Sequence, residues 1–463
     1  MPTPSIVTVP AKNLHQLSQP VVVSDTKRFQ AALEALDTMV IAMRQAHGLG
    51  LAAPQIGLNQ RLIVAEYSSP SDPQGFKLMQ LINPSYQPVR AKTVIASEGC
   101  LSLPGFELPI ERYEQIKVTA TQTDGQVRQW LARDLEARVI QHEIDHLDGQ
   151  LITDRAIPEL DRLKSARVIF FGSNHISASC LYALLATTQV VAVVTETDKL
   201  GQDGVSRRPN PVAQIARELG LPLIQFESIN QPEAITALSQ YPADIGYCVA
   251  YGQLFKAATL ESLSYPIFNL HFSLLPDYPG ATPHLMPILN GDQQTGITLF
   301  KISPKLDAGP ILTQARYKLT QNETGPELLQ ELTNLGILAS LRALVDWRAG
   351  RRELTAIPAA KRSNSSASTG NYAPKLSKES GLINWQLPAV QIERQIRAFA
   401  GWPGSYFFLG AERVIIESAY LERGKLTIET VKSAGRSAQD LSSWLRQRPD
   451  RLTYLESTGK INL

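Results

Sequence analysis

Apolar residues recur at helical spacing in residues 27–46 (KRFQAALEALDTMVIAMRQA), which predicts an amphipathic helix there. Residues 135–147 (LEARVIQHEIDHL) have the same period and predict a second helix. Between them lie β-branched or alternating runs such as 61–67 (RLIVAEY) and 115–125 (QIKVTATQTDG), the latter ending in a DG turn. Residues 1–164 are therefore expected to form an α+β domain with strands between two helices.

From about residue 166 the pattern changes to short, buried-type strands that alternate with helical segments. The strand-like runs are RVIFFG, VVAVVTETD, PLIQF, DIGYCVAYG and IFNLH, and the helical ones include PVAQIARELG and PEAITALSQ. This alternation predicts a parallel, doubly wound (Rossmann-like) α/β sheet over residues 166–350. The first strand leads into GSNHIS at 172–177, which lacks the glycine pattern of a dinucleotide-binding turn, so NAD is not expected.

The last third of the chain begins with a basic and then Ser-rich stretch, which predicts an exposed linker over residues 351–374. After it come one helical run, AVQIERQIRAF, and then strand-like runs, SYFFLG, ERVIIESAYL and KLTIETV. This order predicts a small β-barrel-like (OB-type) domain over residues 375–463. No internal repeat is visible.

Composition narrows the class of protein. The 463 residues, 43% hydrophobic and 19% charged, are typical of a globular protein of about three domains. No apolar run approaches the roughly 20 residues that span a bilayer, and no secretory signal is visible, so we expect no membrane. Cys100, Cys180 and Cys248 are far apart and odd in number, which favours a reducing cytoplasm. A modest basic excess in residues 375–463 is weak support for a nucleic-acid partner.

The sequence HEIDH at 142–146 is the sharpest local signal for chemistry. On a helix, positions i and i+4 share one face, so His142 and His146 can bind one metal ion while Glu143 stands beside it. The same pattern also occurs in ordinary helices, where the histidines are surface residues. A third ligand is needed to decide between the two interpretations.

Two further blocks supply a wider context. GLGLAAPQIG at 48–57, EGCLS at 98–102 and QHEIDHLDG at 141–149 resemble, in order and separation, the three motifs of the peptide deformylase family. ELPIER at 107–112 is similar to the segment that follows the cysteine motif in that family. The resemblance covers roughly residues 1–160.

That resemblance implies a catalytic metal site in which Cys100, His142 and His146 bind the metal and a fourth position stays open for water. Family members use Fe(2+) natively and accept zinc or nickel, whereas the ligand types alone would favour zinc. A zincin-type protease is the alternative for this section. The distant cysteine ligand argues against it.

The resemblance also implies the remaining catalytic groups. Glu143 would accept a proton from water and deliver it to the leaving amine of an N-formyl-methionyl peptide. The side-chain amide of Gln55 and the backbone N–H of Leu101 would stabilise the oxyanion. Gly48 and Gly50 would let the backbone come close to the metal pocket.

A second set of motifs lies in the α/β section. FNLHFSLLPDYPG at 268–280 and LDAGP at 306–310 resemble the catalytic signature of folate-dependent formyltransferases. The tail after NYAPKLSKESGLINW, and above all IRAFAGWPGSYFFLG at 396–410, resembles the C-terminal domain of the methionyl-tRNA formyltransferase family. No metal is required for this chemistry.

The second resemblance implies that a free amine attacks the formyl carbon of 10-formyltetrahydrofolate. Asn269 would donate to the oxyanion, His271 would shuttle the amine proton, and Asp307 would orient the imidazole and raise its pKa. The residues expected to bind the folate cofactor are those of the SLLP run, Ser273, Leu274, Leu275 and Pro276.

Two departures from the family's usual sequence, and one loop, bear on which amine accepts the formyl group. Phe272 stands where the tRNA enzymes usually have Gly, and Pro279 where they usually have Arg. Phe272 looks like some sugar-amine formyltransferases. In contrast, GQDGVSRRPNP at 201–211 is placed like the basic tRNA-contacting loop, where Arg207 and Arg208 would contact phosphates.

The main hypothesis is a bifunctional cytoplasmic enzyme that formylates initiator methionyl-tRNA and deformylates nascent N-formyl-methionyl peptides, with the ribosome as a further expected partner. One alternative gives the transferase another amine, such as an aminosugar nucleotide. Another makes one section a degenerate binding module on a tRNA or ribosome, against which the intact catalytic residue types argue.

Overall fold

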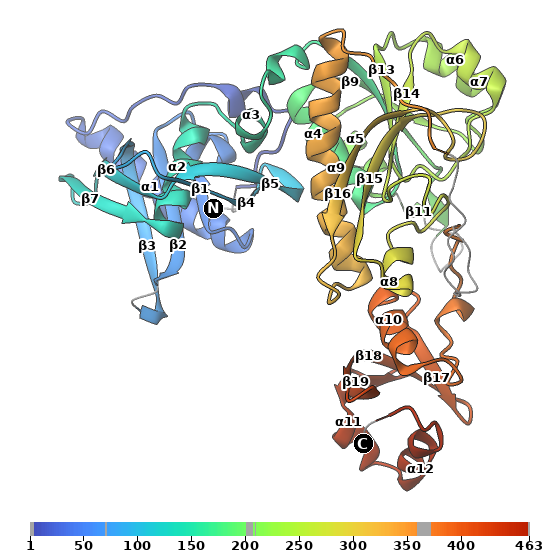
Figure 1. Ribbon diagram of the computed structural model, residues 1–463. Coiled ribbons are helices and arrows are strands. Elements are labelled where there is room, and N and C mark those ends of the chain that lie inside the picture. The colour runs from blue at the N-terminus through green and yellow to red at the C-terminus, as the bar shows by residue number, and fades with distance from the viewer. Residues whose placement is uncertain (1–3, 70–71, 201–206, 209, 359–371, 462–463) are drawn as a thin grey trace. The chain divides into compact units, whose positions relative to one another are not determined.

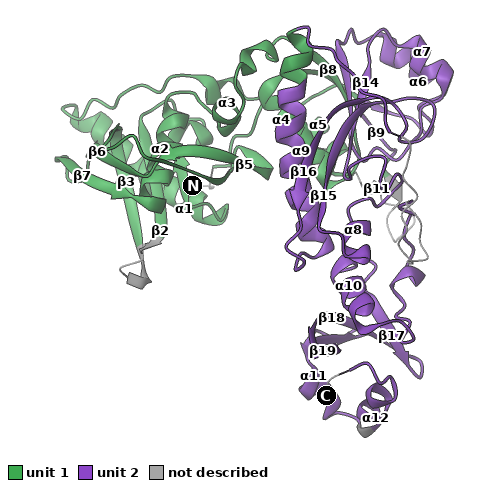
Figure 2. Cartoon of the chain, viewed as in Figure 1, with its two compact units in different colours: residues 1–193, 198–223, 344–349 green, residues 194–197, 224–343, 350–463 purple. Residues whose placement is uncertain are grey.

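A computed structural model describes residues 4–69, 72–200, 207–208, 210–358 and 372–461 of the chain (Figure 1). The chain separates into two compact units (Figure 2). One holds residues 1–193, 198–223 and 344–349, and the other holds residues 194–197, 224–343 and 350–463.

The N-terminal part of the first unit contains both helices that the sequence predicts. Helix α1 spans Thr26–Gln45 and α2 spans Asp134–Leu147. The carboxylate of Asp25 caps α1 by accepting from the amides of Lys27 and Arg28. Shorter helical turns are η1 (Lys12–His15), η2 (Ala53–Ile56), α3 (Ile152–Ala156) and η3 (Leu160–Arg162).

An antiparallel sheet of five strands lies between these helices in the sequence, in the order β1-β2-β3-β6-β7. Its strands are β1 (Gly50–Ala52), β2 (Leu62–Ser69), β3 (Asp72–Pro88), β6 (Gln115–Thr121) and β7 (Val127–Arg133). Residues of β2, β3, β6 and α2 share one hydrophobic core, and α1 packs with β1 and β2 in another. The α+β prediction for this section is confirmed.

A two-stranded ribbon completes this part of the structure. Strands β4 (Thr93–Cys100) and β5 (Leu103–Tyr113) pair antiparallel, and the register shifts between Gly99 and Cys100. Because the ribbon turns immediately after Cys100, this cysteine sits at a tight reversal of the chain.

The next section forms a seven-stranded sheet in the order β12-β9-β8-β13-β14-β15-β16. Its strands are β8 (Arg167–Phe171), β9 (Gln189–Thr195), β12 (Leu223–Gln225), β13 (Ile245–Cys248), β14 (Ile267–His271), β15 (Gln294–Lys301) and β16 (Ile311–Lys318). The helices between and after them are α4 (His175–Thr187), α5 (Pro211–Glu218), α6 (Pro232–Ser239), α7 (Ala257–Ser262), α8 (Met286–Asn290) and α9 (Gly325–Arg348).

This alternation confirms the doubly wound class, with one difference in detail. Strands β13 and β14 are parallel, but β14–β15 and β15–β16 are antiparallel pairs. The sheet is therefore mixed, a common arrangement in which antiparallel strands are added at an edge. Helix α9 is long and apolar enough to cross a membrane, yet 61% of its apolar window is buried inside the structure. A core helix passes the same test, so this is weak evidence for a membrane.

The C-terminal part of the second unit has four antiparallel strands in the order β17-β18-β19-β20. These strands are β17 (Ser405–Leu409), β18 (Glu412–Glu422), β19 (Lys425–Ser433) and β20 (Gln439–Asp440), with helices η4 (Glu379–Gly381), α10 (Ala389–Ala398), α11 (Leu441–Leu445) and α12 (Pro449–Ser457) around them. A core around Phe407, Val431 and Trp444 holds them together. The sequence predicted a small β-barrel-like (OB-type) domain here, and the described residues form a four-stranded antiparallel sheet with a linear strand order.

Candidate functional site

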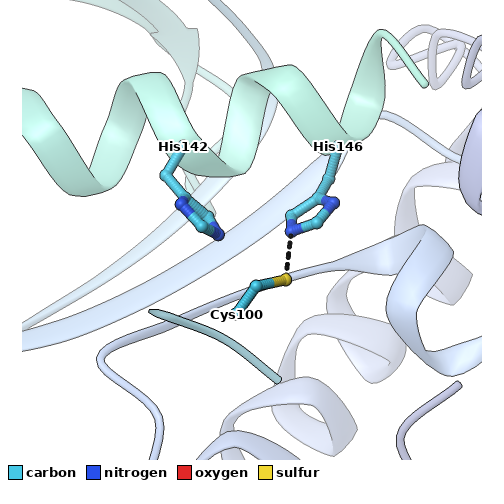
Figure 3. Close-up of side chains that lie close together, drawn as sticks. All are labelled: Cys100, His142 and His146. Carbon is cyan, nitrogen blue, oxygen red and sulfur yellow. Dashed lines mark hydrogen bonds between the residues drawn. The ribbon is translucent and has the colours of Figure 1, made fainter. Parts of the chain in front are cut away.

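Three potential metal ligands converge in the first unit. The ligand atoms of Cys100, His142 and His146 all lie within 4.8 Å of one another. Figure 3 shows both imidazoles on the same side of α2, directed toward the cysteine. The Sγ of Cys100 lies 3.3 Å from Nε2 of His146. One thiolate and two imidazoles within this span are a donor set that suits a tetrahedral divalent ion.

The two histidines differ in protonation, and His146 is in the form that binds a metal. Burial lowers the pKa of His146 well below its usual value, so its imidazole is neutral, the form that ligates metals. Burial also lowers the pKa of His142, but hydrogen bonds with Cys100 and Glu98 outweigh it and raise that pKa well above the usual value. A metal ion would therefore displace a proton from this cluster.

Glu143 lies beside the ligands on α2 and is 4% exposed. Its Oε2 and the Nδ1 of His146 are buried and have no hydrogen-bond partner among the described residues. Burial raises the pKa of Glu143 to about 7, which places the carboxyl near the pH where it can both take and give a proton. A Cβ on Gly50 would lie 2.3 Å from its Oε1, so the glycine leaves room for this carboxylate. The orphaned polar atoms, together with the three ligand atoms beside them, fit a site that holds a metal ion.

Gln55 and Leu101 border the same site. The amide of Ala52 donates to Oε1 of Gln55, which turns the side-chain NH₂ group toward Ser102 Oγ at 3.2 Å and toward the thiol of Cys100. A Cβ on Gly48 would lie 2.7 Å from Cδ1 of Leu101, so Gly48 allows close packing under that residue. The structure thus places both predicted donors next to the ligands.

An ionic network behind the ligands was not identified from the sequence. The carboxylate of Glu98 accepts from Nδ1 of His142 at 2.9 Å and from Arg112 at 2.8 and 3.0 Å. Arg112 also pairs with Asp145, and Arg155 pairs with Asp145 at 2.5 Å. Burial raises the pKa of Glu98, but hydrogen bonds from His142 and Arg112 bring it down to about 2. Glu98 belongs to the EGCLS block, so its position next to Cys100 was the available signal.

Arg138 joins this network from one turn earlier on α2. It donates to the carboxylate of Glu98 at 2.5 Å and to the backbone carbonyls of Val94, at 2.7 Å, and Ile110, at 3.1 Å. A single guanidinium therefore ties the histidine helix to both strands of the ribbon that carries Cys100. No motif pointed to this residue.

A second cluster lies in the second unit, at the end of β14. Asn269 and His271 are two residues apart on β14, so they lie on the same face of the strand. Asn269 is partly exposed, and its amide has no partner among the hydrogen bonds of the described residues. Nε2 of His271 donates to the carbonyl of Tyr278 at 2.9 Å, which leaves Nδ1 as the atom that can accept a proton.

Asp307 lies close to His271 without a direct hydrogen bond. Nδ1 of His271 and Oδ2 of Asp307 are 3.9 Å apart, and that carboxylate oxygen accepts from the amide of Gly280 at 2.8 Å. Asp307 raises the pKa of His271, as expected, but burial outweighs it and the pKa is lowered overall. The net pKa of His271 is therefore below its ordinary value, because the imidazole is only 5% exposed.

The SLLP residues form the turn that follows. The hydroxyl of Ser273 donates to the carbonyl of Asp277 at 2.5 Å, and Leu275 donates from its amide to Thr298 Oγ1 at 3.0 Å. The side chain of Leu274 is partly exposed, as is Pro276. These contacts organise the turn, and a role for the four residues in folate binding stays a prediction.

The predicted tRNA loop lies mostly outside the described residues, which exclude 201–206 and 209. Arg207 and Arg208 form the short strand β11 (Arg207–Arg208), which pairs antiparallel with β10 (Lys199–Leu200). The placement of their side chains is also outside the described part of the chain.

The fold and the site geometry together define an enzyme with two parts. The first is an α+β part with a set of metal ligands beside a buried glutamate, and the second is an α/β part with an Asn–His–Asp cluster. Family models agree with this division. Polypeptide deformylase matches residues 3–162, formyl transferase matches residues 166–344, and the formyl transferase C-terminal domain matches residues 375–439.

Individual relatives match one part or the other. Methionyl-tRNA formyltransferase of Chloroflexus aggregans is 36% identical over 274 residues, which cover 59% of this chain and 86% of that protein. The enzyme of Paracoccus denitrificans is 34% identical over 258 residues, 56% of this chain and 83% of that protein. The chain belongs to the methionyl-tRNA formyltransferase family and carries a polypeptide deformylase domain in front of it.

Solved structures similar to this chain are peptide deformylases. The crystal structure from Synechococcus elongatus in complex with actinonin is 35% identical, covering 34% of this chain and 81% of that chain, with a TM-score of 0.30. The peptide deformylase from Thermotoga maritima is 34% identical, covering 34% of this chain and 100% of that chain, with a TM-score of 0.30.

Proposed function

We propose that the chain hydrolyses the formyl group from N-formyl-methionyl peptides and, in a separate site, transfers a formyl group from 10-formyltetrahydrofolate to initiator methionyl-tRNA. The observation that carries the first activity is the convergence of Cys100, His142 and His146 around an orphaned, buried Glu143. The second rests on the Asn269–His271–Asp307 cluster together with the relatives' activity.

The domain bounds belong to this proposal. Residues 1–164 form the deformylase domain and residues 166–350 the formyltransferase catalytic domain. Residues 351–374 link it to the C-terminal domain at 375–463, which holds the tRNA. The family-model ranges support these bounds.

In the deformylase site, Cys100, His142 and His146 would hold a divalent ion, Fe(2+) by family resemblance, with zinc and nickel as substitutes. When bound, the ion would supply a Lewis acid that lowers the pKa of a water molecule.

Glu143 takes a proton from the attacking water and later delivers it to the amine nitrogen as the C–N bond breaks and formate leaves. Its raised pKa, about 7, suits both transfers near neutral pH. The NH₂ group of Gln55 and the backbone N–H of Leu101 donate to the oxygen that becomes negative during the attack.

In the transferase site, the free amine of the methionyl ester attacks the formyl carbon of the folate. His271 removes the amine proton at Nδ1, because its Nε2 is engaged by Tyr278 and burial keeps the ring neutral. Asn269 donates to the oxyanion, and the bond between the formyl carbon and N10 then breaks as His271 passes the amine proton to N10 and tetrahydrofolate leaves. Ser273, Leu274, Leu275 and Pro276 shape the folate side of the site, and Arg207 and Arg208 contact the acceptor-stem phosphates.

None of the three cysteines forms a disulfide bond, which supports a cytoplasmic location, the compartment where both substrates arise.

Two assays on the full chain test this function. The first measures formate release from a formyl-Met peptide and metal content, with Glu143→Gln as the inactive control. The second supplies charged initiator tRNA and 10-formyltetrahydrofolate and measures formyl-methionyl-tRNA. Wild-type protein that releases no formate and binds no metal would rule out the deformylase.

One observation favours a second acceptor. Phe272, which is buried beside His271, resembles the residue found in some sugar-amine formyltransferases. Formyl transfer to an aminosugar nucleotide, with none to methionyl-tRNA, would replace tRNA as the acceptor. The C-terminal formyl transferase domain argues for tRNA.

A further inference from the structure

The segment that leads into the C-terminal domain pairs with the loop that follows the SLLP turn. The amide of Ala373 donates to the carbonyl of Pro279, and the carbonyl of Ala373 accepts from the amide of Ala281, both at 2.8 Å. The hydroxyl of Thr282 donates to the carbonyl of Pro374, 92 residues later in the chain, at 2.8 Å. Three hydrogen bonds therefore join the loop 279–282 to the segment 373–374.

Gly280 is what allows this close approach. A Cβ at this position would lie 2.2 Å from the carbonyl oxygen of Ala373, and its φ of +123° is one that other residues rarely adopt. The amide of Gly280 donates to the carboxylate of Asp307 at 2.8 Å. The residue that accommodates the C-terminal segment thus also positions a member of the catalytic cluster.

Tyr278, on the same loop, forms hydrogen bonds through both its backbone carbonyl and its side-chain hydroxyl. Its backbone carbonyl accepts from Nε2 of His271 at 2.9 Å. Its hydroxyl donates to Asp292 at 2.7 Å and accepts from the side-chain amide of Asn290 at 2.9 Å. Its ring is buried in a small cluster with Met286 and Ala373. The tyrosine therefore links the catalytic histidine to the C-terminal end of α8 and the residues that follow it.

Helix α10 of the C-terminal part reaches that segment. Arg394 donates to the carbonyl of Asn290 at 3.2 Å, and its guanidinium packs against Gly291, where a Cβ would lie 2.0 Å from Nη2. Arg397, one turn later, donates to the carbonyl of Glu323 at 2.9 Å. Two arginines on one helix face thus dock α10 onto the catalytic part of the unit.

We propose that Tyr278 is a positioning residue that couples the docking of the C-terminal region, through Arg394 and Ala373, to the orientation of the His271 imidazole. The C-terminal region then contributes to the chemical step as well as to holding the acceptor. The proposal rests on the proposed transferase function, because His271 matters only if it handles the amine proton.

The other titratable groups near His271 stay in place in the variants that test this coupling. They are Asp307 on the loop after β15, His284 before α8, and Cys248 at the end of β13 beside Asp307. Asp292, which accepts the Tyr278 hydroxyl, is the charged group on the far side of the tyrosine. A change in the pH profile of Tyr278→Phe therefore reports the position of the loop.

The first experiment uses the full chain with Tyr278→Phe, which removes the hydroxyl and keeps the ring. The transferase kcat should fall about tenfold, the loss expected for one well-placed buried hydrogen bond, while the KM for methionyl-tRNA stays near the wild-type value. Deformylase activity of the same molecules should not change, which controls for folding and concentration. Tyr241→Phe, after α6 and away from the loop, is the matched control and should leave both activities unchanged.

The second experiment combines Tyr278→Phe with Arg394→Met. If both residues act along one route, the double variant should have the kcat of the poorer single variant. Losses that multiply in the double variant would overturn the coupling. So would a Tyr278→Phe protein whose kcat is normal, or one in which only the KM for tRNA rises. If Tyr278→Phe proves too unstable to purify, Arg394→Met alone must lower kcat for the proposal to stand.

A measurement that does not depend on catalysis distinguishes this proposal from the proposed transferase function. Histidine side-chain NMR of the ¹³C-labelled full chain follows the titration of His271 directly, with His271→Gln for assignment. In Tyr278→Phe and in Arg394→Met the apparent pKa of His271 should move toward its ordinary value, because a loosened loop admits water. An unchanged titration in both variants contradicts the coupling, whether or not the wild-type chain formylates tRNA. Absence of wild-type formylation with a shifted titration contradicts only the proposed function.

Discussion

The carboxylate of Glu98 lies 2.9 Å from Nδ1 of His142, one of the two histidines in the cluster with Cys100. A hydrogen bond to the second ring nitrogen fixes the tautomer and orientation of a metal-binding histidine. Glu98 is itself held by Arg112 and Arg138, so the ligand is aligned by a chain of buried charges.

Replacing Glu98 by Gln should weaken metal binding by about 10- to 100-fold, because the amide cannot serve His142 and both arginines as the carboxylate does. Metal release to a chelator, followed by a colorimetric dye, measures the effect. Glu111→Gln, on the exposed face of β5, is the matched control. Wild-type metal affinity in the Glu98 variant would show that the contact does not align the ligand.

Arg138→Leu tests the hydrogen bonds by which Arg138 joins α2 to the ribbon β4–β5. Losing its bonds to Glu98 and to the carbonyls of Val94 and Ile110 should lower the free energy of unfolding by about 2 kcal/mol, the usual effect of removing a buried, charged donor. Urea titration of formyl-peptide hydrolysis measures it. Arg128→Leu, which breaks an exposed pair with Asp124, should change stability by less than about 0.5 kcal/mol. Equal losses of unfolding free energy in the two variants would contradict a stabilising role for Arg138.

Glu98 and Arg138 show which parts of the site could be predicted from the sequence and which could not. His142 and His146 could be predicted because positions i and i+4 share one face of a helix, and Cys100 because its motif resembles that of the peptide deformylase family. Arg138 could not, since its partners are backbone carbonyls of a ribbon whose sequence carries no sign of them. The net lowering of the pKa of His271 could not be predicted for a similar reason. The motif identified Asp307 as its neighbour but gave no measure of burial.

In the fold, too, elements with a local sequence pattern could be predicted and long-range pairings could not. Helices α1 and α2 have apolar periods that predict them to within a residue or two. The pairing of Ala373 with Pro279 and Ala281 depends on the fold of a distant segment and has no local signal. The antiparallel direction of β15 and β16 likewise has no local signal, because the pattern of buried strands is the same for either direction.

Gly50→Ala should disable the deformylase without removing its metal. The new methyl group would lie 2.3 Å from Oε1 of Glu143 and displace the carboxylate from its place beside the ligands. Formate release should fall by about 100-fold, the lower range for loss of a general acid–base group, with metal content unchanged. Adding Glu143→Gln should then cause little further loss. A Gly50→Ala enzyme that keeps its activity would show that Glu143 is not confined by this contact.

The acid side of the transferase pH profile reports His271. Burial lowers its pKa below the ordinary value of about 6.5, and the neutral ring is the active base, so kcat/KM should stay constant down to about pH 6.5 and fall only below it. Asp307 raises that pKa, so Asp307→Asn should move the acid limb to still lower pH, even if the plateau rate drops. Initial rates of methionyl-tRNA formylation between about pH 5 and pH 7, where His271 changes charge, measure both profiles. An acid limb that begins above pH 6.5 in the wild type, or that moves upward in Asp307→Asn, would show that burial does not control the protonation of His271.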